Sequence, residues 1–197
     1  IAERVGGNAM DFAPHVKGME LPGYEPRGLK TMALGLAVSP RGACHNRSGA
    51  YEADFSGAVD RLRADSGRGA LVAASEDFAS VLDSLIICKF LRKCFTDFYS
   101  EAAELLNKVT GWDFSASELR RAGERIQISK RLFNQREGWQ PEDDWLPPRL
   151  LSEALPDAYV ATSHEILPVW REARKFYSEQ EQAALELTEA ITLISVD

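Results

Sequence analysis

Apolar positions recur with a helical period through the second half of the chain, which predicts a mainly α-helical protein. Residues 75–95 carry apolar side chains at helical spacing and then in a nearly continuous run. This pattern predicts a helix whose later part is apolar on every side and therefore buried. Earlier, the small and apolar residues 29–39 predict a second buried helix, in which Gly35 would allow a neighbouring segment to approach closely.

Two more helices are expected directly after this run. Residues 96–111 are expected to begin at Thr96 as the N-cap and to bury one stripe, formed by Phe98, Ala102, Leu105, Leu106 and Val109. Residues 115–138 open with a capping-box pattern in which Ser115 precedes Glu118 by three positions. Their expected buried stripe is Leu119, Ala122, Gly123, Ile126 and Phe133.

The first quarter of the chain, residues 1–55, is rich in Gly and Pro and is expected to be mostly loops. Residues 15–26 predict a short strand followed by turns, and residues 56–74 read as a connector. Residues 139–157 contain four prolines and are expected to form an extended strap without chemistry, anchored by its two Trp side chains.

The predicted fold class is thus mainly α, an irregular multi-helix domain with a loop-rich N-terminal quarter. The predicted domain spans residues 1–157. A helical tail, 158–197, is left unassigned, with weaker helical patterns over 163–177 and 179–193.

Charge and hydropathy exclude several classes of protein. The net charge of the 197 residues is −7 and no long basic run occurs, so a nucleic-acid partner is not expected. No apolar stretch is long enough to cross a bilayer, so no membrane partner is expected either. No signal peptide is visible, and a cytoplasmic location is predicted.

The cysteine count limits the metal chemistry. Cys44, Cys88 and Cys94 are too few and too sparse for a disulfide framework, which is consistent with a reducing compartment. A cubane iron–sulfur cluster held only by cysteines needs four thiolates, and this chain cannot supply them alone. The chain also opens on Ile1 rather than Met, so we expect a processed protein or a segment of a longer one.

The spacing of Asp83 and Cys88 within an apolar run has two interpretations. In the first, both lie on a helix that carries one polar residue and one buried cysteine. In the second, the helix ends near Asp83 and the chain turns, so that Cys88 ligates a metal centre. Asp83, as an ionised carboxylate, would then accept hydrogen bonds from the N–H edge of a pterin.

A second candidate is the segment Cys44-His45-Asn46-Arg47, which follows a Pro and a Gly. It is either a surface turn with solvated arginines or part of a pocket built from loops. In a pocket, His45 would transfer protons and Arg47 would clamp a phosphate. The residue pattern alone does not separate the two.

The segments 2–52 and 81–90 together resemble the aldehyde:ferredoxin oxidoreductases, and 138–157 resembles the C-terminal region of that family. These are enzymes that carry tungsten, or sometimes molybdenum, on a bis-pterin cofactor and oxidise aldehydes to carboxylates. The resemblance implies that this chain is the last helical domain of a larger enzyme. Electrons would leave through a [4Fe–4S] cluster to ferredoxin, and the rest of the enzyme, ferredoxin and an aldehyde would be the partners. A homodimer is also possible for this family.

The resemblance also implies roles for individual residues. Cys88 would be the fourth ligand of the [4Fe–4S] cluster, beside the tungstopterin or molybdopterin. Asp83 would bind the amino edge of one pterin, Ile87 would offer backbone contacts to the same ligand, and Arg47 would lie near the pterin or its phosphate. His45 would be the catalytic proton-transfer residue. Both cofactors need residues outside this chain, so the chain alone is expected to be inactive.

One position departs from the family motif Asp-x-x-Gly-Leu-Cys, because Ile86 stands where the motif has Gly. If the turn requires a positive φ, Ile is costly there. Two alternative functions remain open at this point. The chain could be a freestanding helical structural or interaction subunit that kept the fold without the chemistry. It could also be a subunit of a related acyl-CoA-reducing complex.

Overall fold

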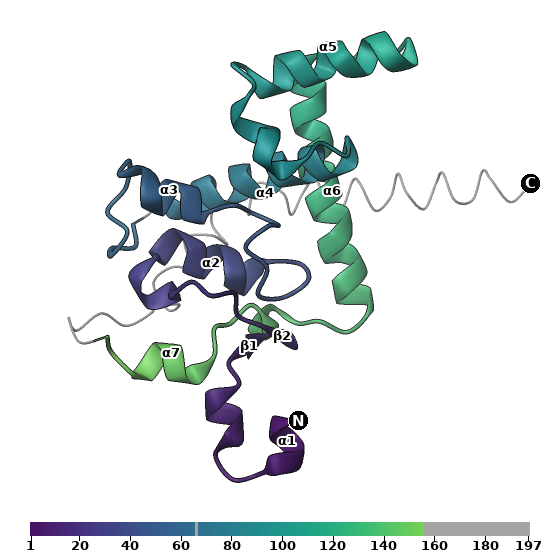
Figure 1. Cartoon of the computed structure of the whole chain (residues 1–197). Helices are drawn as coiled ribbons and strands as arrows, with labels where there is room; N and C mark the ends of the chain where they lie inside the picture. The colour runs from purple at the N-terminus through teal and green to yellow at the C-terminus, as the bar shows by residue number, and fades with distance from the viewer. Residues whose placement is uncertain (66, 156–197) are drawn as a thin grey trace, which may run out of the picture.

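The computed structural model describes residues 1–65 and 67–155, and Figure 1 shows their arrangement. This part of the chain is mainly helical, as predicted. The α-helices are α1 (Ala2–Val5), α2 (Lys30–Val38), α3 (Tyr51–Ser56), α4 (Arg68–Ser84), α5 (Phe98–Thr110), α6 (Ala116–Arg136) and α7 (Pro148–Ser152). Short 3-10 helices are η1 (Ala9–Phe12), η2 (Pro26–Gly28), η3 (Lys89–Lys93) and η4 (Pro141–Asp143). The predicted tail, 158–197, lies outside the described residues, so the boundary at 157 stays a prediction.

Helix α2 is buried between two clusters of hydrophobic side chains, and it confirms the helix expected at 29–39. All nine of its residues are buried. One side packs with Val16, Leu146 and Leu150, and the other packs with Ala50 and Val72. A Cβ at Gly35 would lie only 2.6 Å from Ser48 Oγ, so the small residue does allow a neighbouring loop to approach.

The first turn of α2 is held by a buried carboxylate. Asp54 on α3 accepts hydrogen bonds from the backbone N–H groups of Thr31, at 3.2 Å, and Met32, at 2.9 Å. These N–H groups have no partner within the helix. Arg68 at the start of α4 lies 3.5 Å from the same carboxylate and donates to Thr31 Oγ1, so three elements meet at this end of α2. Residues 68–74, expected to be part of a connector, form the first turns of α4, and residues 51–55, expected to be mostly loop, lie in α3.

Helix α6 begins at the predicted capping box and packs along α4. Ser115 Oγ accepts from Glu118 N at 3.2 Å, and the Glu118 carboxylate accepts from Ser115 N at 2.8 Å. The buried positions of α6 are Leu119, Gly123, Gln127 and Ile128. Phe133, expected in the buried stripe, is 62% exposed. Gln127, a polar residue outside the expected stripe, is buried because its side-chain amide donates to Glu76 O and Ser80 Oγ on α4.

Helix α5 projects beyond the rest of the structure and buries only its first turns (Figure 1). Phe98, Tyr99, Ala102 and Ala103 are buried, but Leu105 and Val109, expected in the same stripe, are exposed. The helix starts one residue later than predicted, at N-cap Asp97. Glu101 sets this start, because its carboxylate accepts from the N–H groups of both Thr96 and Asp97.

The C-terminal strap is not simply extended. Pro141 and Pro148 lie in the first turns of η4 and α7, where a missing N–H costs nothing. Leu146 and Leu150 enter the core around α2. Asp144 is only 2% exposed and forms ion pairs with Lys17 and Arg131, so the strap contributes a buried charge as well as packing.

A two-stranded hairpin of β1 (His15–Val16) and β2 (Met19–Glu20) packs beside the end of α2, where a short strand was expected. Within the described residues, every helix is too short or too polar to serve as a transmembrane segment.

Candidate functional site

Helix α4 ends one residue after Asp83, and the chain then turns sharply. The N–H of Ile87 donates to Leu82 O at 3.0 Å, and the N–H of Ile86 donates to Asp83 O at 3.1 Å. These two bonds form a Schellman motif, which requires a left-handed residue at the turn. Ile86 has φ 57°, so the position where the family motif has Gly does adopt the left-handed conformation.

The turn exposes the segment that was expected to continue as a buried helix. Cys88 is exposed and immediately precedes η3. Ile86 is 91% exposed and Phe90 89% exposed, so the prediction of a buried helix over 75–95 is wrong beyond Ser84. The turn directs these apolar side chains away from the core. An exposed apolar strip of this kind is typical of a surface that another protein segment covers.

The loop that follows α2, residues 39–49, carries His45 and Arg47. Gly42 anchors it against β1 with φ 103°, and a Cβ there would lie 2.4 Å from Val16 O. The N–H of Arg47 donates to Cys44 O and the N–H of Gly49 donates to His45 O, which closes two successive turns. We call residues 39–49 the His45 loop.

Two contacts join the His45 loop to the turn that carries Cys88. The guanidinium of Arg47 forms an ion pair with the carboxylate of Asp83. The ammonium group of Lys89 donates to Asn46 O at 3.0 Å. Segments about forty residues apart in the sequence therefore meet at one place. Arg47 contacts Asp83 directly, a pairing that the sequence analysis did not anticipate.

His45 lies against two tyrosines. Its ring centroid is 5.5 Å from that of Tyr24 and 6.0 Å from that of Tyr51, and the two tyrosine rings are stacked. Burial lowers the pKa of His45 below its usual value, and the positive charges of Lys89 and Arg41 lower it further. The imidazole is therefore neutral at pH 7, the form in which it can accept a proton.

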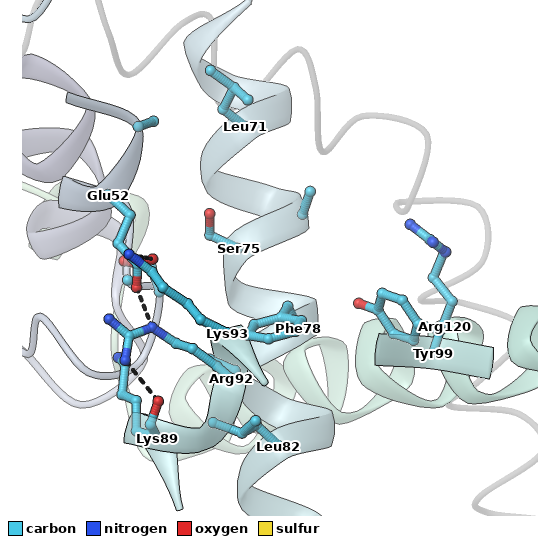
Figure 2. A pocket seen from close by; sticks show the side chains of 15 residues that line it. Glu52, Leu71, Ser75, Phe78, Leu82, Lys89, Arg92, Lys93, Tyr99 and Arg120 are labelled. Atoms are coloured by element: carbon cyan, nitrogen blue, oxygen red, sulfur yellow. Dashed lines mark hydrogen bonds and ion pairs between the residues drawn. The ribbon is translucent and has the colours of Figure 1, made fainter. Parts of the chain in front are cut away.

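A cavity of about 380 Å³ opens beside the His45 loop and the Cys88 turn (Figure 2). The apolar wall of the cavity is formed by one face of α4, which carries Leu71, Phe78 and Leu82. Cations from η3 and α6 surround the opening, and Arg92 forms an ion pair with Glu52 at 2.5 Å. At the far end Arg120 covers the ring of Tyr99 at 4.2 Å. The size and the mixed lining are those of a small-molecule pocket.

A second cavity adjoins Arg47 on the other side of the loop. Lys130 on α6 lines it together with Arg41 and Arg47. Burial lowers the pKa of Lys130, and the nearby charge of Arg47 lowers it further. Sequence reasoning missed Lys89, Lys130 and the tyrosines that flank His45. Only Lys89 carried a signal, its place next to Cys88, because the others reach the site through tertiary packing.

The described residues could supply only part of the ligand set of an iron–sulfur cluster and a pterin. Across residues 1–65 and 67–155, no group of three or more His, Cys, Asp or Glu side chains is arranged to hold a metal ion. Cys88 is an exposed thiol on a fixed turn, and thiolates are the usual ligands of iron–sulfur clusters. In Asp83, Arg47 contacts Oδ2, and the carboxylate is 46% exposed, so it can accept further hydrogen bonds.

The chain matches the family described as "Aldehyde ferredoxin oxidoreductase, domains 2 & 3" over residues 1–181. It is 32% identical over 182 residues to the tungsten-containing aldehyde ferredoxin oxidoreductase of Pyrococcus abyssi, covering 88% of this chain and 29% of that protein. The enzymes of the same name from Pyrococcus horikoshii and Thermococcus kodakarensis are 32% and 31% identical. Those matches cover 85% and 83% of this chain and 28% of each relative.

The chain therefore belongs to the aldehyde ferredoxin oxidoreductase family, as the resemblance implied, and corresponds to a C-terminal helical part of it. It spans less than a third of the length of these curated relatives.

Proposed function

We propose that this chain forms the C-terminal part of a tungsten- or molybdenum-dependent enzyme that oxidises aldehydes to carboxylates. The observation that carries the proposal is the junction of the His45 loop with the Cys88 turn. Arg47 pairs with Asp83 and Lys89 binds Asn46 O, so an acid, a thiol and a neutral histidine lie around one junction. Family membership gives this combination its chemical meaning.

In this proposal the turn after α4 holds the edge of a pterin and one corner of a [4Fe–4S] cluster. The bound metal pterin supplies the two-electron oxidation, and the cluster supplies the one-electron exit. Cys88 would provide the fourth cluster thiolate, and Asp83 would accept the pterin's N–H groups. Arg47 holds that carboxylate in a fixed orientation, because a guanidinium binds a carboxylate through a rigid set of N–H groups. Ile87 offers its carbonyl to the ligand, because its N–H is already bound to Leu82 O.

His45 would move a proton during the oxidation. Converting an aldehyde to a carboxylate takes up the elements of water and releases protons, so a base is needed near the carbonyl carbon. The low pKa of His45 keeps the imidazole neutral and ready to accept a proton. Tyr24 and Tyr51 pack against the imidazole ring.

The cavity of Figure 2 would hold the part of the aldehyde that does not react. Phe78 and Leu82 give this cavity an apolar wall. Lys89 joins the cavity to the His45 loop, since it lines the cavity and binds Asn46 O. Ferredoxin would accept the electrons, and the remainder of the enzyme would cover the exposed strip around Cys88.

The test uses the full-length enzyme purified without oxygen. We expect tungsten or molybdenum, four irons per chain, and reduction of ferredoxin or a viologen dye that depends on an aldehyde. A full-length protein that contains neither metal nor iron would instead favour the structural subunit without chemistry. Reduction that requires a coenzyme A ester would favour the acyl-CoA-reducing complex.

A further inference from the structure

An ionic triad, in which two of the three side chains are buried, lies at the C-terminal end of α2, away from the proposed cofactor contacts. Asp144 on the strap accepts from Lys17 Nζ through Oδ1 and from Arg131 Nη2 through Oδ2, both at 2.7 Å. The side chains of Lys17 and Asp144 are each only 3% exposed. The triad joins the hairpin, helix α6 and the strap.

The cations of the triad also bind the end of α2. Lys17 Nζ donates to Ala37 O at 2.6 Å and to Ser39 O at 3.3 Å, and Arg131 Nη1 donates to Val38 O at 3.1 Å. Asn134, one turn after Arg131 on α6, donates to Pro40 O at 2.5 Å. Carbonyls at the end of a helix lack partners within the helix and carry partial negative charge. Here four successive carbonyls, 37 to 40, are bound by side chains from distant parts of the chain.

The backbone conformation of Lys17 also supports a role for its ammonium group at the end of α2. Lys17 and Gly18 form the two-residue turn of the hairpin, with φ 51° and 77°. Asn or Asp is usual at the first of these positions, and a long side chain there is disfavoured. The strain is explained if the ammonium group is needed at the end of α2. The cavity between these residues measures about 30 Å³, room for about one water, so the triad is not a ligand site.

The His45 loop starts where the triad binds Ser39 O and Asn134 binds Pro40 O. Ser39 and Pro40 are its first two residues, so the direction in which they leave α2 helps to set the position of His45, together with the contacts of Gly42, Arg47 and Asn46. We propose that Asp144 is a positioning residue for His45, acting through Lys17 and Arg131 on the carbonyls that begin the loop. This inference rests on the proposed function for its catalytic part and on the hydrogen bonds alone for its structural part.

The test compares Asp144→Asn with Asp54→Asn in the full-length enzyme. Asp54 is a matched control, because it is also a buried carboxylate that binds α2, but at the opposite end. Asp144→Asn is expected to speed amide hydrogen exchange across 39–49 by about tenfold. Asp54→Asn should speed exchange at the start of α2 and leave 39–49 unchanged.

Kinetics provide the second readout. A displaced His45 should lower kcat of Asp144→Asn by about tenfold or more, with KM within about twofold of the wild type. Asn134→Ala, which removes only the bond to Pro40 O, should show a smaller change of the same kind and serves if Asp144→Asn does not fold.

Equal exchange in 39–49 for the two aspartate variants would overturn the proposal, as would faster exchange with an unchanged kcat. If the wild-type enzyme oxidises no aldehyde, the proposed function fails, and the exchange data alone then decide whether the triad positions the loop.

Discussion

Replacing Ile86 with Gly should stabilise the turn that carries Cys88. Ile86 has φ 57°, and a left-handed conformation costs a non-glycine residue about 1–2 kcal/mol. Its side chain is 91% exposed, so its removal loses little buried surface. Glycine has more conformational freedom in the unfolded chain, which reduces the stabilisation by about 0.5–1 kcal/mol. The net gain is therefore about 0.5–1 kcal/mol, which slows local opening about two- to fivefold.

The assay is native-state hydrogen exchange of the Ile87 amide, whose N–H is bound to Leu82 O across the turn. Glu137→Gly is the control, because Glu137 ends α6 with an ordinary φ of −79°. Glycine there should speed exchange at the end of α6 by a similar factor. If Ile86→Gly also speeds exchange at Ile87, the turn is not strained and the reasoning is refuted.

Four further predictions concern the site. Lys89→Met should raise the pKa of His45 toward about 6.5 without reaching it, because burial lowers this pKa more than the charge of Lys89 does. NMR titration of the imidazole measures the pKa, and an unchanged value would show that Lys89 does not affect it. The pKa of His45 is lower in the folded protein than in the unfolded chain, so the unfolded chain takes up the proton first as the pH falls. The free energy of unfolding should therefore decrease as the pH drops from about 6.5 through the folded pKa. His45→Gln should flatten this part of a plot of urea midpoint against pH. His45→Ala should lower kcat about 10²–10⁴-fold at normal metal content, and full activity would exclude a proton-transfer role. Phe78→Ala should raise KM for bulky aldehydes more than for acetaldehyde; an equal change would place the substrate elsewhere.

Local signals in the sequence predicted the elements they control. The capping box at Ser115 and the small, apolar run that became α2 were sufficient for those two helices. The end of α4 was harder, because Ile86 hides a turn that Gly would have marked. The apolar pattern continues through residues 85–91, so the pattern alone does not reveal the hydrogen bonds that end the helix.

The candidate site could be predicted only where a family motif named its residues. Asp83, Cys88 and His45 were expected, but the ion pair between Arg47 and Asp83 was not. Asp144 was missed because it is the last of three consecutive acids in a proline-rich strap, a run typical of a solvated loop, and its partners lie 127 and 13 residues away in sequence. Contacts of this kind are set by tertiary packing, which spacing does not encode.

The most direct test of the central claim compares Cys88→Ser with Cys94→Ser by electron paramagnetic resonance of the reduced full-length enzyme. Both thiols are exposed, so a loss of packing is a minor effect for either variant. Replacing a cluster thiolate with a hydroxyl should abolish the [4Fe–4S] signal or shift its potential strongly. We expect this change for Cys88→Ser and a wild-type signal for Cys94→Ser. The same cluster signal in the wild type and both variants would contradict this expectation.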